Sequence, residues 1–351
     1  MMVNQIMTGH LGDPDKIAAL GITTSTVNIF VATVILGVNK ALDVLCTQAF
    51  GNGDLRLCGE YLNRGRFIAF TLSIPPVLLL GIFAEDIALL FTRDENVIRL
   101  SAEYMIALLP AMLLHGQCDL IRKWLLRMRI GDIPMISNII MIAIHIPMAY
   151  LFVYVLDMDM VGLAHALTCS MTITFFVLIG QVAYREDIKD AVFWPSWESF
   201  QHWGDYMKIS LPIICLLAIF FIAQEVILVF AGLLGTLELA AQTQITLLIT
   251  LLNVIAVGVQ ESTIIMLGNL IGENRAELAW RVYRFLVKVA LVLYGLVAVF
   301  LLIFQNQYAY LMSDDEGVQD LLIQTVPIVA LFSFMQCMFR FIQSPLMAVS
   351  L

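Results

Sequence analysis

The chain has 351 residues, of which 60% are hydrophobic and only 13% are charged. A soluble protein carries about 25% charged residues, so this composition excludes a water-soluble globular chain. The formal net charge of −9 gives no indication of a nucleic-acid partner, and we expect the lipid bilayer to surround the protein.

Apolar runs follow one another along the chain, and each is longer than a typical helix of a soluble core. Their ranges are 20–47, 67–92, 104–121, 133–156, 160–184, 208–233, 239–267, 282–305 and 320–345, and residues 1–9 are typical of the end of another. A helix needs about 20 apolar residues to cross a bilayer. Because the runs are continuous rather than alternating, they exclude a β-barrel and predict about ten transmembrane helices.

Two Gly-rich turns indicate an internal repeat. One apolar run ends in Gln48-Ala-Phe-Gly51-Asn-Gly53, and another ends, 221 positions later, in Asn269-Leu-Ile-Gly272-Glu-Asn274. Basic residues follow each turn, before the next apolar run: Arg64, Arg66, Arg281 and Arg284. An even number of predicted spans separates the turns, so the copies are parallel repeats. We expect an all-α membrane protein of two pseudo-symmetric six-helix lobes, residues 1–192 and 193–351.

The same offset predicts that part of each lobe lies outside this chain. It places the start of the first copy about a dozen residues before Met1, and the end of the second copy about two spans beyond Leu351. We therefore expect an incomplete second lobe and roughly ten of twelve transmembrane helices.

The basic residues are distributed unevenly over the connections. Fourteen of the 19 Lys and Arg residues flank alternate connections, at 48–66, 122–132, 185–208 and 272–284. The other connections hold few basic residues and an acidic cluster, Asp314-Asp315-Glu316. The positive-inside rule therefore places the four basic connections in the cytoplasm. Whether the surrounding membrane is the plasma membrane or an internal one such as the vacuole is left open.

Motifs of nucleotide hydrolysis and of enzyme catalysis are missing from the sequence. It has no Gly-x-x-x-x-Gly-Lys-Ser/Thr phosphate loop, no Ser-His-Asp constellation and no zinc-ligand spacing among its six cysteines. We expect a protein that is not an enzyme, that has no cofactor and that acts as a monomer. Any pumping then draws on an ion gradient or on a partner subunit.

Ionisable residues inside apolar spans are costly and are functional candidates. Glu225 lies deep in the seventh span, where we expect it to exchange a proton for a cation. Glu261 lies near the inner end of the eighth span and is a second candidate, although it also fits an interfacial position. Lys40 and Asp43 are one helical turn apart and are expected to pair. Arg340 lies in the last span, and the sequence assigns it no partner.

The residues of the two turns have a structural interpretation. Gly51, Gly53 and Gly272 are expected to end helices and reverse the chain at the cytoplasmic face. Gln48 and Asn269 are expected to cap or brace these turns. Since such braces often belong to a moving gate, Gln48 also stands among the candidate ion-coupling or substrate-binding residues.

Several segments carry a recognisable pattern: Gly37-Val-Asn-Lys-Ala-Leu-Asp43-Val-Leu-Cys-Thr-Gln48-Ala-Phe-Gly51-Asn-Gly53, then Gly9-His-Leu-Gly12, Leu125 through Pro134, Val161-Gly162-Leu-Ala-His-Ala-Leu, Glu225-Val-Ile-Leu-Val-Phe-Ala-Gly232 and Gly268-Asn269-Leu-Ile-Gly272. Together they resemble the multidrug and toxic compound extrusion (MATE) transporters in their eukaryotic form. The resemblance implies a fold of two six-helix lobes and marks Glu225 as the coupling acid. In the same comparison Phe220 stands for a second acid, Met266 for an arginine, and Asn253 for a tyrosine of the eighth span. Asn253 is therefore a candidate for the substrate pocket.

The resemblance implies export of organic cations or other amphipathic and xenobiotic small molecules in exchange for H⁺, or for Na⁺ in some relatives. Two alternatives stay open. One is a flippase for lipid-linked precursors, which shares the broad fold. The other is a membrane protein that does not transport, such as a degenerate fragment.

Overall fold

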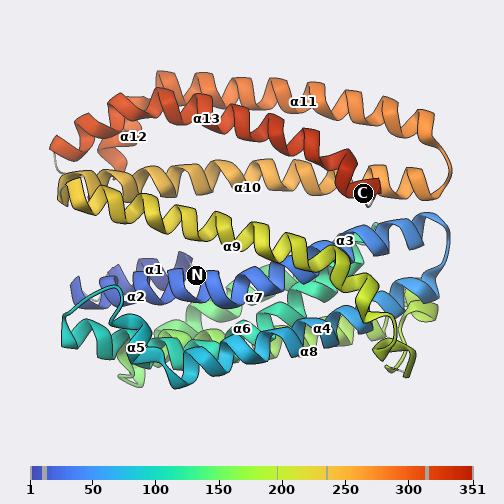
Figure 1. The fold of residues 1–351 in the computed structure, drawn as a ribbon, viewed down its shortest axis with the longest axis horizontal. Coiled ribbons are helices and arrows are strands. Elements are labelled where there is room, and N and C mark those ends of the chain that lie inside the picture. Colours follow the sequence, from blue (N-terminus) through green and yellow to red (C-terminus); the bar gives the residue numbers. More distant parts are fainter. Residues whose placement is uncertain (1, 10–13, 196, 235, 313–315, 350–351) are drawn as a thin grey trace. The chain divides into compact units, whose positions relative to one another are not determined.

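The computed structural model describes residues 2–9, 14–195, 197–234, 236–312 and 316–349 (Figure 1). Every regular element within these ranges is helical. The main helices are α1 Met2–Gly9, α2 Pro14–Val27, α3 Thr33–Gly51, α4 Leu55–Ile82, α5 Ala84–Ala88, α6 Glu95–Arg127, α7 Asp132–Tyr150, α8 Asp159–Ala183, α9 Trp203–Leu234, α10 Thr236–Gly272, α11 Ala276–Ile303, α12 Gln305–Met312 and α13 Glu316–Val349. Short π-helical segments, Asn28–Ala32 and Leu151–Val155, follow α2 and α7, and 3₁₀ segments, Glu186–Ala191 and Trp197–Phe200, precede α9.

Nine stretches of the described residues are long and apolar enough to cross a membrane. They are Asp15–Gly51, Leu55–Ile82, Glu95–Arg127, Asp132–Val155, Asp159–Ala183, Trp203–Ala231, Gln244–Gly272, Ala276–Ile303 and Gly317–Ala348. Each coincides with one of the nine complete apolar runs of the sequence, so the predicted class of all-α integral membrane protein is confirmed. The expected signature Gly9-His-Leu-Gly12 and the acidic cluster lie partly outside the described residues, at His10 to Gly12 and at Asp314 and Asp315.

Two helices extend further into basic sequence than the apolar runs predicted. α4 begins at Leu55 and therefore includes Arg64 and Arg66, which the sequence placed in a connection. α6 continues to Arg127 and includes Arg122. Arg64 and Arg122 are each 7% exposed and Arg127 is 1% exposed, so these guanidinium groups are packed inside the protein. The prediction failed because a charge ends a hydropathy window, whereas a helix continues when its charges are paired or hydrogen-bonded.

The chain forms two compact units, which we describe separately. Unit 1 comprises Met1–Ala49 and Asp54–Phe221, and unit 2 comprises Phe50–Gly53 and Ile222–Leu351. This division differs from the expected lobe boundary at 192/193, because the first part of α9 packs with unit 1. The Tyr206 hydroxyl on α9 donates to the Val38 carbonyl of α3 at 2.9 Å, and Tyr206 is buried.

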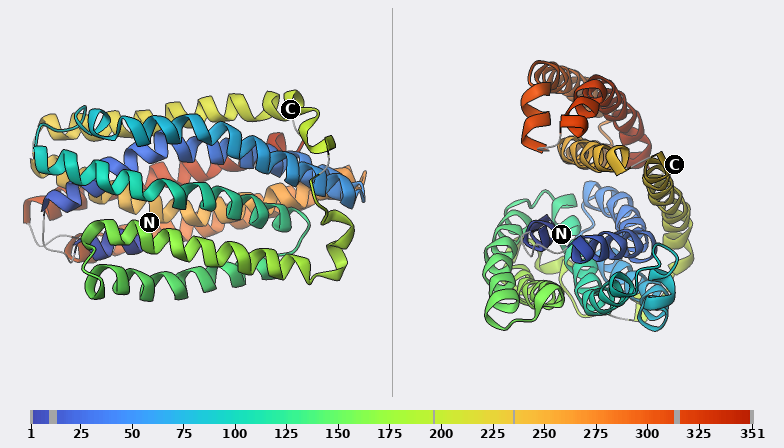
Figure 2. Two further views of the ribbon diagram at one scale, coloured as in Figure 1. Left: turned by 90° about the horizontal axis from the view of Figure 1, so that it is seen from below. Right: turned by 90° about the vertical axis from the view of Figure 1, so that its left-hand side faces the viewer.

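Unit 1 is built around α6. This helix packs against α2, α4 and α8, and α7 packs on α8, so that the long helices of the unit run side by side (Figure 2). A cluster of buried apolar residues, mainly from α2, α6 and α8, fills the space between them; it includes Leu20, Tyr104, Leu108 and Leu163. In unit 2, α13 packs against both α10 and α11. Its apolar clusters contain Leu252, Val326, Tyr294 and Phe341.

The helix boundaries show the predicted repeat directly. α4 spans Leu55–Ile82 and α11 spans Ala276–Ile303, so both ends of α11 lie 221 positions after those of α4. The same offset relates Gly51 at the end of α3 to Gly272 at the end of α10. It also relates Glu95 at the start of α6 to Glu316 at the start of α13. The two copies therefore fold into the same succession of helices.

Both Gly-rich turns reverse the chain in the same way. The Gly53 amide donates to the Phe50 carbonyl at 3.0 Å, and the Asn274 amide donates to the Ile271 carbonyl at 2.9 Å. Gly53 has a φ of 79° and Asn274 a φ of 58°. Glycine and, to a lesser degree, asparagine tolerate this left-handed conformation, which explains the residue type at the third position of each turn.

Candidate functional site

A buried ion-pair cluster lies at the end of α3. One Asp43 carboxylate oxygen accepts from Nε of Arg127 at 2.8 Å and lies 2.6 Å from its Nη2. The other oxygen lies 3.4 Å from Lys40 and 3.7 Å from Lys123. The expected Lys40–Asp43 pair is therefore present, but the closest partner is Arg127, which the sequence had placed in a connection. Because Asp43 and Arg127 are each 1% exposed, this cluster joins α3 to α6.

A second polar contact joins the same helices further from the turn. The Asn39 side-chain amide on α3 donates to the carboxylate of Asp119 on α6. Asn39 is fully buried, and its own carbonyl oxygen has no hydrogen-bond partner among the described residues. Asp119 was not among the residues predicted from the sequence, although an acid inside an apolar span is a sufficient signal.

A third polar chain connects four helices of unit 1. Nε2 of His145 on α7 lies 2.7 Å from the Asn4 side-chain oxygen on α1, and Nδ1 lies 3.4 Å from the Ser170 hydroxyl on α8. The Asn4 amide in turn donates to the Tyr104 hydroxyl on α6 at 3.1 Å. All four side chains are buried. His145 thus belongs to a hydrogen-bonded network that joins four helices.

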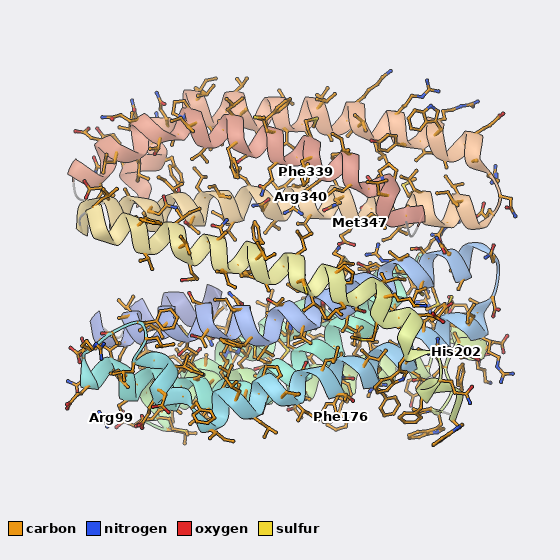
Figure 3. The ribbon with its side chains drawn as sticks, in the orientation of Figure 1. Arg99, Phe176, His202, Phe339, Arg340 and Met347 are labelled. Atoms are coloured by element: carbon orange, nitrogen blue, oxygen red, sulfur yellow. The ribbon has the colours of Figure 1, made fainter. Side chains whose placement is uncertain are left out.

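Unit 2 has a polar network of its own, which is centred on Arg340 (Figure 3). From α13, its Nη1 donates to the Gln260 side-chain oxygen at 3.1 Å, and its Nη2 donates to the Asn253 side-chain oxygen at 3.3 Å. The Gln260 amide also donates to the Arg340 backbone carbonyl at 3.4 Å. The structure therefore supplies the partners that the sequence did not assign, and it brings the candidate Asn253 next to a cation.

The contacts of Asp119 and Arg340 occupy equivalent places in the two repeats. Asn39 and Gln260 are 221 positions apart, as are Asp119 and Arg340. In each copy an amide side chain of the helix before the Gly-rich turn holds an ionisable group of a later helix. The contact between the two helices is kept in both repeats, but the ionisable group is a carboxylate in the first and a guanidinium in the second.

Glu225 lies apart from these networks. It is half-buried on α9, and no hydrogen bond or ion pair joins it to another of the described residues. It lies within Trp203–Ala231, which has a mean hydropathy of 2.8. Glu261 is half-buried on α10, one residue after Gln260. Their roles as candidate coupling residues stay predictions.

One residue of the turns differs from the cap that the sequence suggested. Asn269 is fully buried, yet both polar atoms of its side chain lack a hydrogen-bond partner among the described residues. It therefore does not cap the second turn, which is closed by backbone hydrogen bonds. Gln48, its repeat equivalent, is half-buried on α3, and its role in a gate stays a prediction.

Comparison with known proteins shows which family has a similar sequence. The family model described as MatE matches residues 1–151 and 212–350. Multidrug and toxin extrusion protein 1 of Xenopus tropicalis is 28% identical over 329 residues, which cover 93% of this chain and 57% of that protein. The protein of the same name from Homo sapiens is 24% identical over 95% of this chain and 59% of its own length. The chain thus spans less than two thirds of these relatives.

Solved structures show the same fold. The crystal structure of the eukaryotic MATE transporter AtDTX14 superimposes with a TM-score of 0.90 at 19% sequence identity. The superposition covers 99% of this chain and 77% of that one.

Proposed function

Because the chain is an integral membrane protein of the MatE family, we propose that it forms the larger part of a secondary transporter. The transporter exports organic cations or other amphipathic small molecules in exchange for H⁺ or Na⁺. Parallel repeats of this kind alternate between two states that open to opposite sides of the membrane. The names of the relatives, multidrug and toxin extrusion proteins, support this substrate class.

The proposal rests mainly on the surroundings of the Glu225 carboxyl group. It lies in the most apolar of the nine spans and has no cationic partner among the described residues. A lone carboxylate in an apolar span is costly, so a proton, a sodium ion or a cationic substrate stabilises it. Since one carboxylate cannot be neutralised by two of these at once, coupling ion and substrate compete for it, which is the requirement for exchange.

The proposed cycle follows from this competition. A protonated Glu225 no longer attracts a cationic substrate, and the substrate leaves toward the outer side. Loss of the proton to the cytoplasm restores the carboxylate, which binds the next substrate. Each ligand biases the two states only through the difference in its affinity for them.

Asn253 has a more limited role in this proposal than the family resemblance implied. Its side-chain oxygen accepts from Arg340 at 3.3 Å, so that this atom is already engaged. We assign Asn253 and Gln260 to holding Arg340 in place. Glu225 remains the residue that we expect to contact the substrate or the coupling ion.

The test is transport of a cationic dye in vesicles that contain the full-length protein. Proton and sodium gradients are imposed separately, and Glu225→Gln, Glu261→Gln and Glu277→Gln are compared. Glu277 lies in the exposed first turn of α11 and controls for the loss of one carboxylate. We expect Glu225→Gln to abolish gradient-driven export, Glu261→Gln to reduce it less, and Glu277→Gln to leave it unchanged. Wild-type export by Glu225→Gln together with loss in Glu261→Gln would assign coupling to α10 and refute the proposal.

A further inference from the structure

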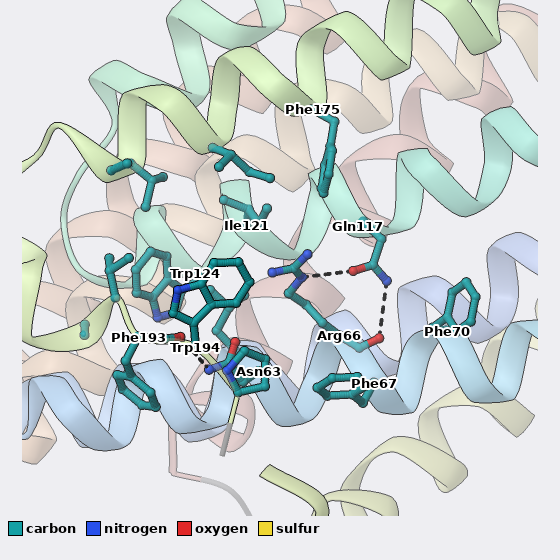
Figure 4. A pocket seen from close by; sticks show the side chains of 17 residues that line it. Asn63, Arg66, Phe67, Phe70, Gln117, Ile121, Trp124, Phe175, Phe193 and Trp194 are labelled. Carbon is teal, nitrogen blue, oxygen red and sulfur yellow. Dashed lines mark hydrogen bonds between the residues drawn. The ribbon is translucent and has the colours of Figure 1, made fainter. Parts of the chain in front are cut away.

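Unit 1 contains a cavity that the transport proposal does not use. It has a volume of about 700 Å³ and lies between α4, α6, α8 and the chain segment 191–195 (Figure 4). Its walls are mostly apolar and aromatic, with Phe67, Phe70 and Phe175 among the residues that line it. This volume lies within the range of protein cavities that bind organic ligands.

One cation points into this cavity. Arg66 lies roughly three helical turns into α4. Its Nε donates to the Gln117 side-chain oxygen at 3.0 Å, and the Gln117 amide donates back to the Arg66 carbonyl at 3.3 Å. The guanidinium carbon lies 5.8 Å from the centre of the Phe175 ring. These contacts fix the direction of the side chain, as Figure 4 shows.

The contacts leave the charge of Arg66 without a counterion. Within the part of the chain that the structure describes, Arg66 makes no ion pair with an acidic side chain, and its side chain donates a hydrogen bond through Nε alone. By contrast, Arg127, which is more deeply buried than Arg66, is paired with Asp43 at 2.6 Å. A guanidinium in apolar surroundings is stabilised by a carboxylate or phosphate, which the two Nη groups can bind together.

The position of the cavity favours a lipid as the source of that anion. By the positive-inside rule the connection after α8, which covers the cavity, faces the cytoplasm. This connection exposes large aromatic side chains: Tyr184 is 91% exposed, Trp194 92% and Trp197 78%. Exposed Trp and Tyr are typical of the membrane–water interface, and the cytoplasmic leaflet carries the anionic lipids. Trp194 also lines the cavity itself.

We propose that this cavity binds the phosphate-bearing head of an anionic lipid of the cytoplasmic leaflet. Arg66 binds the phosphate through its Nη groups, Gln117 holds the guanidinium in place, and Phe67, Phe70 and Phe175 contact the first part of the acyl chains. The site lies wholly in unit 1 and is independent of Glu225.

The test measures quenching of Trp fluorescence, because Trp124 and Trp194 line the cavity. The purified protein in neutral detergent is titrated with phosphatidylserine or with diacylglycerol, which lacks the phosphate, each carrying the same brominated acyl chains. A charge-assisted hydrogen bond is worth about 1.5–3 kcal/mol, so phosphatidylserine should quench at concentrations about tenfold lower or better. Arg66→Gln, which keeps a hydrogen bond to Gln117 feasible, should lose this preference.

Arg56→Gln is the matched control. It removes the same charge from the same helix, but the Arg56 side chain is 74% exposed and lies outside the cavity. It should keep the wild-type preference. Equal quenching of the wild type by both lipids, or an unchanged preference in Arg66→Gln, overturns the proposal. Relief of quenching by inorganic phosphate shows a site for soluble anions and overturns the lipid assignment. Since the wild type alone gives two of these outcomes, the proposal stays testable even if Arg66→Gln does not fold.

Discussion

Removal of Asp43 should destabilise the protein more than removal of its closest partner, Arg127. Asp43 is the carboxylate that contacts Arg127 at 2.6 Å, Lys40 at 3.4 Å and Lys123 at 3.7 Å. Asp43→Asn leaves three cationic side chains beside a neutral amide. Arg127→Met instead leaves a carboxylate that still has two lysines nearby. The two variants therefore differ in the charge that stays unbalanced.

The expected magnitudes follow from the burial of the pair. Breaking a buried ion pair costs about 3–5 kcal/mol, because one charge is left without a partner. We expect the upper end for Asp43→Asn and about half of that for Arg127→Met. The double variant replaces the closest ion pair by neutral groups, and we expect it to recover part of the loss, because Lys40 and Lys123 still lie beside a neutral amide. For a cooperative unit of 150–250 residues, 1 kcal/mol changes the unfolding temperature by about 2–4 °C, so a loss of about 5 kcal/mol in Asp43→Asn should lower it by roughly 10–20 °C.

The assay is thermal unfolding of the purified protein in detergent, with all three variants measured under the same conditions. Similar losses in both single variants would show that the lysines do not stabilise Asp43. A double variant that is as unstable as the sum of the single ones would refute the argument from unbalanced charge.

Two further predictions concern the topology and the turns. Single cysteines placed beside Arg56 and Lys189 should be shielded from an impermeant thiol reagent added outside intact cells, whereas those beside Asp94 and Asp159 should be labelled; external labelling of the first pair would disprove the assigned orientation. At the turns, Gly53→Ala should cost about 1 kcal/mol because Ala resists a positive φ, whereas Asn274→Gly should change stability by less than about 0.5 kcal/mol. Equal effects in thermal unfolding would show that backbone conformation does not select these residues.

The sequence was sufficient to predict the helices that cross the membrane and their repetition. Hydropathy alone determines where about 20 apolar residues fit a bilayer. The offset between Gly51 and Gly272 also predicted which helices correspond, and α4 and α11 agree with it at both ends. A repeat preserves element lengths even after most of its side chains have changed.

The partners of the polar residues could be identified only from the structure. Arg127 and Asp43 are 84 positions apart, and Arg340 and Asn253 are 87 apart, so no local spacing links them. The sequence also assigned the basic ends of α4 and α6 to connections, since a single chain does not show which charges are neutralised by another helix. Glu225 could be found from the sequence because its significance lies in its apolar surroundings, which are local.

The opposite charges at equivalent repeat positions have an electrical consequence. Asp119 lies 24 positions after the first residue of α6, and Arg340 lies 24 positions after the first residue of α13. Moving one elementary charge across the membrane costs or releases about 2.3 kcal/mol per 100 mV. When both spans shift by the same depth, the work on an ionised carboxylate and the work on a guanidinium have opposite signs and cancel. The membrane voltage then acts on the ions that are carried rather than on this part of the protein.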